Sequence, residues 1–337
     1  MAGDEQKTAR NIRGFWAGLG KRLIGRQEFG IFIAFILLFT FFALKTPAFG
    51  TFSNLMNLGR QISNIGIMAI GMTFLIICGE FDLSVGSIFA FVSGVSGLLM
   101  LTGMPIWVAV FLGLLMATAI GLINGLISTY GRIPSFITGL GMLNVLRGAF
   151  LLLTGGMPVA ISGFLPPGRA TDLFTFAGKG MLFGVVPMMF VFFLVLLAIG
   201  TFLLKKTRLG FHVYAVGGNP KAARIAGLNV EGMKIFAFML TGLTTGIASL
   251  LQLSFIGTVT GQVGQGYELD AISAVIVGGT KLSGGDGSLL GTFLGAAIVG
   301  ALRNGLVLIG VSPFWQMLAI GVVIVIAVGI DRWTARK

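Results

Sequence analysis

Long uncharged stretches separate short groups of charged residues along most of this chain. A helix needs about 20 apolar residues to cross the hydrocarbon core of a bilayer, and several of these stretches have room for one. The longest, residues 83–131, has room for two, with a turn expected at Gly103-Met104-Pro105. The pattern predicts ten membrane segments, near residues 29–46, 58–78, 84–102, 105–129, 134–154, 182–204, 232–256, 268–279, 287–309 and 314–330.

The eighth of these segments, residues 268–279, is too short to cross a membrane by itself. It is expected to be a half-helix, or to lie inside the bundle where lipid does not contact it. Small residues recur at helical spacing in other segments, as in Gly242-x-x-x-Gly246, and they predict helices that pack closely together.

The composition agrees with this pattern. Of the 337 residues, 55% are hydrophobic and 10% are charged, whereas soluble proteins carry about 25% charged residues. We therefore expect an all-α polytopic membrane protein with one transmembrane domain over residues 29–330. Residues 1–28 and 331–337 are expected to form short tails, and residues 205–231 an extramembrane loop.

The distribution of Lys and Arg predicts the orientation. These residues are concentrated in the two tails and in the 205–231 loop, whereas the opposite side is assigned only Lys45, Arg169 and Lys179. Positively charged loops stay on the cytoplasmic side, so both termini and this loop are expected in the cytoplasm. This topology accounts for the net charge of +12 without a nucleic-acid partner.

Several kinds of chemistry are missing from the sequence. With one histidine and one cysteine, His212 and Cys78, we expect no metal site and no disulfide. Gly-Lys occurs twice, but neither copy forms a phosphate-binding loop, so no cofactor and no catalytic residue are expected.

Acidic residues are also informative. Ion-driven carriers usually bury carboxylates at mid-membrane. Here the acidic residues near the predicted segments flank them, which argues against such a carrier; they are Glu80, Asp82, Glu231, Glu268, Asp270, Asp286 and Asp331.

The loop contains the signature of a short helix. Asn219 can cap it, Pro220 suits its first position, and Gly227 can end it in a left-handed turn. So short a helix is marginally stable alone and is expected to pack against something. Two interpretations stay open: a connector on the membrane surface, or a docking helix for a cytoplasmic partner.

The motif Gly217-Gly218-Asn219-Pro220-x-Ala222-Ala223-Arg224-x-x-Gly227 resembles the cytoplasmic loop of monosaccharide ABC-importer permeases of the ribose, xylose, arabinose and galactose type. Four more motifs resemble the same family in the same order, so that the resemblance runs from about residue 30 to the C-terminus. They are Gly79-Glu80-Phe81-Asp82-Leu83-Ser84-Val85-Gly86-Ser87, Pro134-Ser135-Phe136-Ile137-Thr138, Gly266-Tyr267-Glu268-Leu269-Asp270-Ala271-Ile272 and Gly278-Gly279-x-x-Leu282-x-Gly284-Gly285.

The resemblance implies a permease of the bacterial cytoplasmic membrane that pairs with a second copy or a related chain. It implies two further partners, a cytoplasmic subunit that carries ATP and Mg²⁺ and an extracytoplasmic sugar-binding protein. It also implies a coupling helix that binds the ATPase, made by Gly217, Gly218, Asn219, Pro220, Ala223, Arg224 and Gly227. The family-motif loop is Glu80, Asp82 and Ser84, but Glu80-Phe81 departs from the family pattern and leaves the role of Glu80 open.

A few polar residues lie within the apolar segments. Amides donate and accept hydrogen bonds, so they suit a neutral polyol that crosses without water; the alternative is that they join helices. The candidates for the translocation path are Asn124, Asn144, Arg147, Gln252, Arg303 and Asn304.

Together these features predict the permease subunit of an ATP-driven importer for a monosaccharide, which is not itself an enzyme. Two alternatives remain open. One is an ABC permease for another small polar solute, such as a nucleoside, a branched-chain amino acid or a signalling sugar. The other is a carrier driven by an ion gradient.

Overall fold

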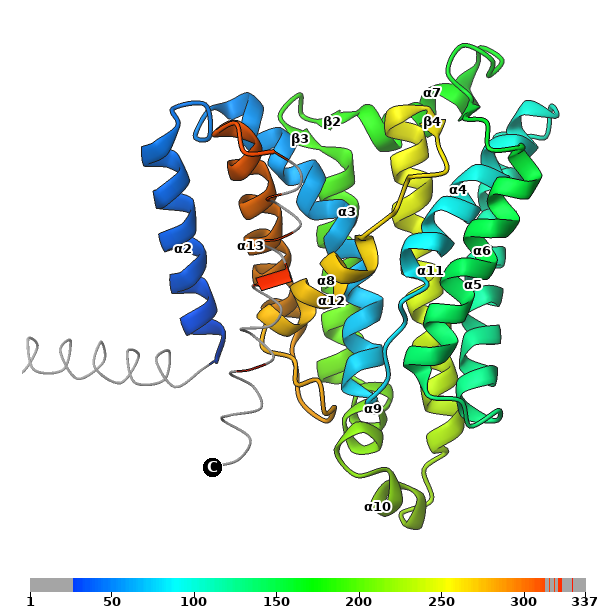
Figure 1. Ribbon diagram of the computed structural model, residues 1–337, viewed down its shortest axis with the longest axis vertical. Helices are drawn as coiled ribbons and strands as arrows, with labels where there is room; N and C mark the ends of the chain where they lie inside the picture. The colour runs from blue at the N-terminus through cyan, green and yellow to red at the C-terminus, as the bar shows by residue number, and fades with distance from the viewer. Residues whose placement is uncertain (1–26, 313–314, 316–317, 319–320, 323–328, 330–337) are drawn as a thin grey trace, which may run out of the picture.

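The chain forms a bundle of long helices whose axes run roughly parallel (Figure 1). In this computed structural model the described residues are 27–312, 315, 318, 321–322 and 329. The tails expected at 1–28 and 331–337 lie almost entirely outside the described residues, as does most of the tenth segment, 314–330.

Helices occupy the other nine predicted segments within the described residues. They are α2 (Gln27–Lys45), α3 (Phe52–Ile77), α4 (Val85–Leu101), α5 (Ile106–Thr129), α6 (Ser135–Thr154), α8 (Met188–Lys206), α11 (Val230–Ile256), α12 (Tyr267–Val277) and α13 (Leu289–Leu308). Seven of the described helices are long and apolar enough to cross a membrane; α4 is a shorter apolar helix. The expected all-α polytopic architecture is therefore confirmed.

The loops between these helices contain further helices and short strands, of which the sequence predicts only the short helix that follows Asn219. Helix α7 (Arg169–Lys179) lies within the loop that joins α6 to α8, and α9 (Arg208–Gly218) and α10 (Pro220–Ile225) follow α8. Two antiparallel strand pairs are also present, β1 (Val159–Ala160) with β4 (Thr258–Val259) and β2 (Met181–Leu182) with β3 (Val186–Pro187). Helix α7 and the strands lie at one end of the bundle, and α9 and α10 lie at the other (Figure 1).

The core of the bundle forms around α3, most of which is buried between α8, α11, α12 and α13. Glycine lets the backbones approach, as expected from the small-residue pattern. A β-carbon on Gly242 of α11 would lie 2.3 Å from the carbonyl oxygen of Ala117 in α5, closer than any side chain tolerates. This close contact confirms the predicted packing of α11.

Helices α4 and α12 both begin inside the bundle, after non-helical segments that lead in from opposite ends (Figure 1). Residues 78–84 lead into α4, and residues 257–266 lead into α12. The two helix starts meet where a β-carbon on Gly86 would lie 2.2 Å from the carbonyl oxygen of Gly264. The short eighth segment, α12, is thus a buried half-helix, as predicted.

The buried helix starts correct one expectation about acidic residues. Asp82 and Asp270 flank predicted segments in the sequence, but both are fully buried in the bundle. A sequence position outside an apolar segment does not place a residue outside the membrane when the lead-in segment is itself enclosed by helices.

Candidate functional site

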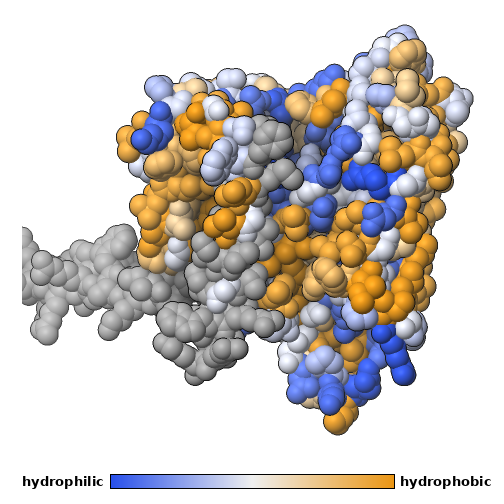
Figure 2. Space-filling view, in the orientation of Figure 1, coloured by the Kyte–Doolittle hydropathy of each residue, from blue (hydrophilic) through white to orange (hydrophobic). Residues whose placement is uncertain are grey.

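A polar cavity of about 190 Å³ opens between α3, α11, α12 and α13. It lies in the half of the bundle nearer α7, because its α3 residues fall in the first half of that helix and Arg303 falls near the end of α13. On the face of the molecule that is drawn in Figure 2, hydrophilic residues lie within the otherwise apolar middle of the bundle. The lining residues are Arg60, Gln61, Asn64, Ile65, Gln252, Phe255, Tyr267 and Arg303.

Hydrogen bonds and an ion pair fix several of these side chains. The Asn64 amide donates to the Gln252 side-chain oxygen at 3.0 Å, and the Arg303 guanidinium pairs with buried Asp270 at 2.7 Å. The lining side chains include two guanidinium groups, which donate hydrogen bonds, and three amides, which both donate and accept. The site can therefore form hydrogen bonds of both kinds with a polar solute.

Two of the six path candidates, Gln252 and Arg303, line this cavity. The other four lie elsewhere. Asn144 is exposed on α6, where its amide donates to the carbonyl oxygen of Leu140. Asn304 is buried in α13, and its amide exchanges hydrogen bonds with that of Asn54 in α3.

Arg147 of α6 binds the segment that leads into α12. Its Nη1 donates to the carbonyl oxygens of Gly261 and Val263, both at 2.7 Å. These backbone acceptors belong to non-helical residues inside the bundle, where unpaired carbonyls are costly. Arg147 therefore holds the 257–266 segment in place.

Asn124 belongs to a buried network with two residues of the family-motif loop. The Asp82 carboxylate accepts from the Ser84 backbone N–H at 2.7 Å, the Ser84 hydroxyl at 2.6 Å and the Asn124 amide at 2.9 Å. All three residues are fully buried. The network joins the start of α4 to α5.

Sequence reasoning missed most of the cavity. Arg60 and Gln61 are adjacent in α3, and Asn64 lies about one helical turn after both of them. That periodic polar stripe within an apolar segment is the signal that could have identified them. Tyr267 is the first residue of the short helix α12. The sequence gives no sign that this residue lies inside the bundle.

The opposite end of the bundle carries the short helix expected in the loop. Asn219 caps α10, with its side chain accepting from the Ala222 backbone N–H at 3.0 Å, Pro220 is the first helical residue, and Gly227 has a φ of +83°. Ala223 is buried against Val216 of α9 and Val230 of α11. All these features match the predicted helix.

The resemblance includes Gly217 and Gly218 in the coupling helix, but in the structure they end helix α9 and precede α10. Gly217 is buried and packs against backbone, while Gly218 is exposed. The two neighbours therefore face different surroundings.

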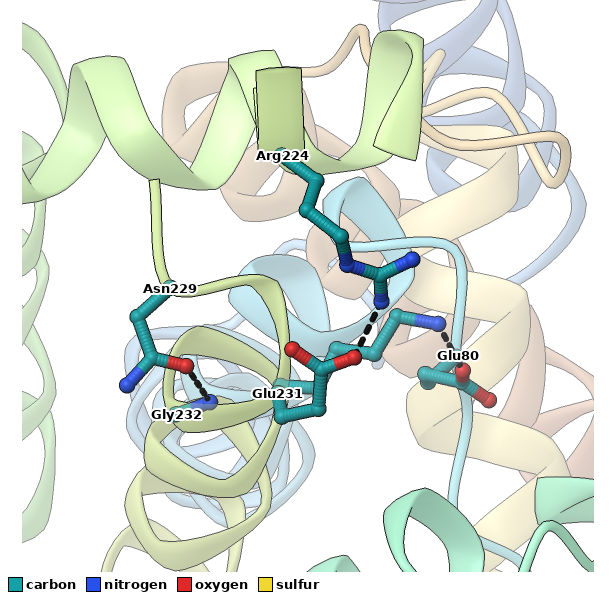
Figure 3. Close-up of polar contacts among 6 residues, drawn as sticks. Glu80, Arg224, Asn229, Glu231 and Gly232 are labelled. Carbon is teal, nitrogen blue, oxygen red and sulfur yellow. Dashed lines mark hydrogen bonds and ion pairs between the residues drawn. The ribbon is translucent and has the colours of Figure 1, made fainter. Parts of the chain in front are cut away.

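Charged side chains tie α10 to the start of α11 (Figure 3). Arg224 of α10 pairs with Glu231, and Asn229 caps α11 by accepting from the Gly232 backbone N–H at 2.8 Å. One turn further along α11, Lys234 contacts Glu80 at 2.5 Å, with both side chains mostly buried. The Glu80 pair connects the loop region to the segment that leads into α4.

The Glu80–Lys234 pair predicts a charge-swap result. Reversing either charge alone (E80K or K234E) should destabilise the protein, because two like charges would then face each other in partly buried positions. The double reversal should recover most of the loss, with an interaction energy of about 1 kcal/mol or more. The interaction energy is measured by thermal unfolding of the unmodified chain, the two single variants and the double variant. Additive effects of the two reversals would contradict the pairing.

Comparison with known proteins places these features in a family. The family model described as the branched-chain amino acid transport system permease component matches residues 54–328. The ribose import permease of Escherichia coli K12 is 40% identical over 89% of this chain and 92% of its own. The corresponding ribose permease of Bacillus subtilis is 38% identical over 91% and 93%.

The xylose transport system permease of Escherichia coli K12 is 31% identical over 99% of this chain and 98% of its own. The matches span nearly the full length of each relative and include the cavity, the family-motif loop and α10. The chain therefore belongs to the family of multi-pass permease subunits of bacterial sugar ABC importers that includes the ribose and xylose permeases, and it has no catalytic role of its own.

Proposed function

We propose that this chain and a second copy form the membrane pathway of an ATP-driven importer for a monosaccharide of the ribose or xylose type. The cavity supports the proposal, since the guanidinium, amide and phenol groups of its lining can replace the hydrogen bonds to water that a sugar loses on entering the membrane. The relatives' names add support for a sugar, although the family model is described by branched-chain amino acid transport.

The proposed orientation places α9 and α10 in the cytoplasm and α7 with β1–β4 outside. Lys205, Lys206 and Arg208 lie at the α9 end of α8, as the positive-inside rule requires for a cytoplasmic surface. With the tenth segment crossing once more, ten segments would put both termini in the cytoplasm. The outer end would then receive sugar from an extracytoplasmic binding protein.

The proposed site of ATPase binding is α10. Ile225, at the end of this helix, has 89% of its surface exposed, while Ala223 on the other face anchors the helix to α9 and α11. An exposed large apolar residue on a short, anchored helix suits insertion into a groove of a partner protein. Motion of the ATPase would then pass through α10 and the Glu80–Lys234 pair to the helices around the cavity.

The replacement Ile225→Glu tests this docking. Because Ile225 makes little contact within the chain, the variant should fold, but it should retain the ATP-binding subunit at least ten-fold less, since burying the isoleucine is worth about 1.5–3 kcal/mol. The measurement is co-purification from native membranes with the ATPase identified by mass spectrometry. Phe183→Glu is the matched control, because Phe183 is 91% exposed and lies in the turn between β2 and β3, which are at the opposite end of the bundle (Figure 1).

The same preparations test the function as a whole. Proteoliposomes with the ATPase and binding protein should take up labelled ribose or xylose only when ATP is supplied, and Ile225→Glu should abolish that uptake. Uptake driven by an ion gradient without ATP, or ATPase retention equal to that of the unmodified chain in Ile225→Glu, would overturn the proposal. Uptake of leucine but not of sugar would favour an amino acid as the substrate.

A further inference from the structure

An open groove with a volume of about 450 Å³ follows the exposed face of α8. Its described lining residues all belong to that helix and recur every three or four positions, so they lie on one face. Most of them are apolar, as Leu194, Leu197 and Phe202 are, whereas Lys205 and Lys206 lie at the end where α9 begins. The groove is therefore apolar along its length and positively charged at one end.

The length of the groove matches one leaflet of a bilayer. Leu194 and Lys205 are about 16 Å apart along the axis of α8, at a rise of about 1.5 Å per residue. The hydrocarbon core is about 30 Å thick, so this distance is close to half of it. Because α8 is long and apolar enough to cross the membrane, the apolar part of the groove lies among acyl chains and the lysines lie near the headgroups.

The positive charge at this end is concentrated and unpaired. Lys205, Lys206 and Arg208 are all exposed, and among the described residues no carboxylate forms an ion pair with any of them. Of the described helices that can cross a membrane, α8 alone has two basic residues in its last turn. Phe211, one turn after Arg208 on α9, leaves 68% of its surface exposed, as apolar side chains of an interfacial helix do.

We propose that this groove is a binding site for an anionic phospholipid. One acyl chain lies along Leu194, Leu197 and Phe202, and the phosphate binds Lys205 and Lys206 through charge-assisted hydrogen bonds. In the orientation proposed above, the lipid belongs to the cytoplasmic leaflet, whose anionic surface attracts clusters of Lys and Arg beside a membrane span. A cytoplasmic protein fits less well, because it can reach the lysines but not the apolar part of the groove.

The test compares two lipids that share the same acyl chains: phosphatidylglycerol, which is anionic, and phosphatidylcholine, which has no net charge. Each is titrated into the full-length chain after delipidation in detergent, and native mass spectrometry measures how much lipid the chain retains. Phosphatidylglycerol should bind at least about twenty-fold more tightly, because each of the two lysines favours an anionic headgroup by about five-fold.

Three variants separate the charge from the groove. Lys205→Gln/Lys206→Gln should lose at least about ten-fold of the preference for phosphatidylglycerol, while Lys205→Arg/Lys206→Arg should keep it. Ala198→Trp, which fills the apolar part of the groove, should weaken the binding of both lipids. Lys221→Gln is the control and should change neither affinity, because it removes an exposed lysine of α10 outside the groove. Size-exclusion profiles verify that each variant is folded.

Equal binding of the two lipids to the unmodified chain would overturn the inference, as would a preference that survives in folded Lys205→Gln/Lys206→Gln. If that variant instead lost the ATP-binding subunit while its lipid preference stayed the same, the lysines would belong to the ATPase interface. If Ala198→Trp left both affinities unchanged, the lysines would attract headgroups without the groove, and the site would not exist. The proposed import of a sugar is tested separately, because lipid binding is measured on the chain alone.

Discussion

Replacing Gly217 by alanine is expected to prevent formation of the folded permease, whereas the same replacement at Gly218 should be tolerated. A β-carbon on Gly217 would lie 1.6 Å from the carbonyl oxygen of Ile77 and 2.7 Å from the backbone nitrogen of Gly285. These two atoms form a hydrogen bond of 2.8 Å with each other. The methyl group would therefore force apart the end of α9, the end of α3 and the turn before α13.

The expected cost at Gly217 is about 3 kcal/mol or more, since the clashing atoms are backbone and cannot rotate away. At Gly218 the nearest atom to the added carbon is the Cα of Gly285 at 3.9 Å, an ordinary contact. Gly218→Ala should then change stability by no more than about 1 kcal/mol. The monodisperse yield and the thermal unfolding of both variants are measured in detergent, and equal behaviour of the two would contradict the close packing of Gly217 against Ile77 and Gly285.

The sequence predicts the helices well because each is marked by length and by apolar composition. Capping residues predict α10 with equal success, since Asn219, Pro220 and Gly227 act locally and need no tertiary information. Helix α9 is not predicted, because it lies in the stretch assigned to a loop and ends in two glycines, which have low helix propensity. Only the tertiary structure, through the backbone contact of Gly217 with Ile77, explains why a glycine is needed at this helix end.

The candidate site is less predictable, because it depends on which helix faces meet. Asn144 and Gln252 are both amides in apolar segments, yet one lies exposed on α6 and the other lines the cavity. Nothing in their local sequence separates them, since the difference comes from the placement of α11 beside α3. The depth of Asp82 is hidden for a similar reason: the non-helical segment that carries it is enclosed by neighbouring helices.

Asp82 is expected to be the most sensitive acidic residue for folding. Asp82→Ala would leave the Ser84 backbone N–H and the Ser84 hydroxyl without their acceptor in a fully buried site, while the Asn124 amide would keep its hydrogen bond to the Ser84 hydroxyl oxygen at 2.9 Å. Each buried group left unpaired costs about 1–3 kcal/mol, so the variant should lose about 2 kcal/mol or more. The carboxylate that joins the start of α4 to Asn124 of α5 would be gone.

The stability of Asp82→Asn should fall between that of the unmodified chain and that of Asp82→Ala. Asparagine keeps the shape of the side chain but replaces one acceptor oxygen by a donor that faces other donors. Asp172→Ala is the matched control: Asp172 is exposed in the first turn of α7, where its loss costs about 1 kcal/mol or less. Thermal unfolding of the three purified variants gives the order of their stabilities. If Asp82→Ala were as stable as Asp172→Ala, water would have to satisfy the two Ser84 donors, and the network would not hold α4 in place.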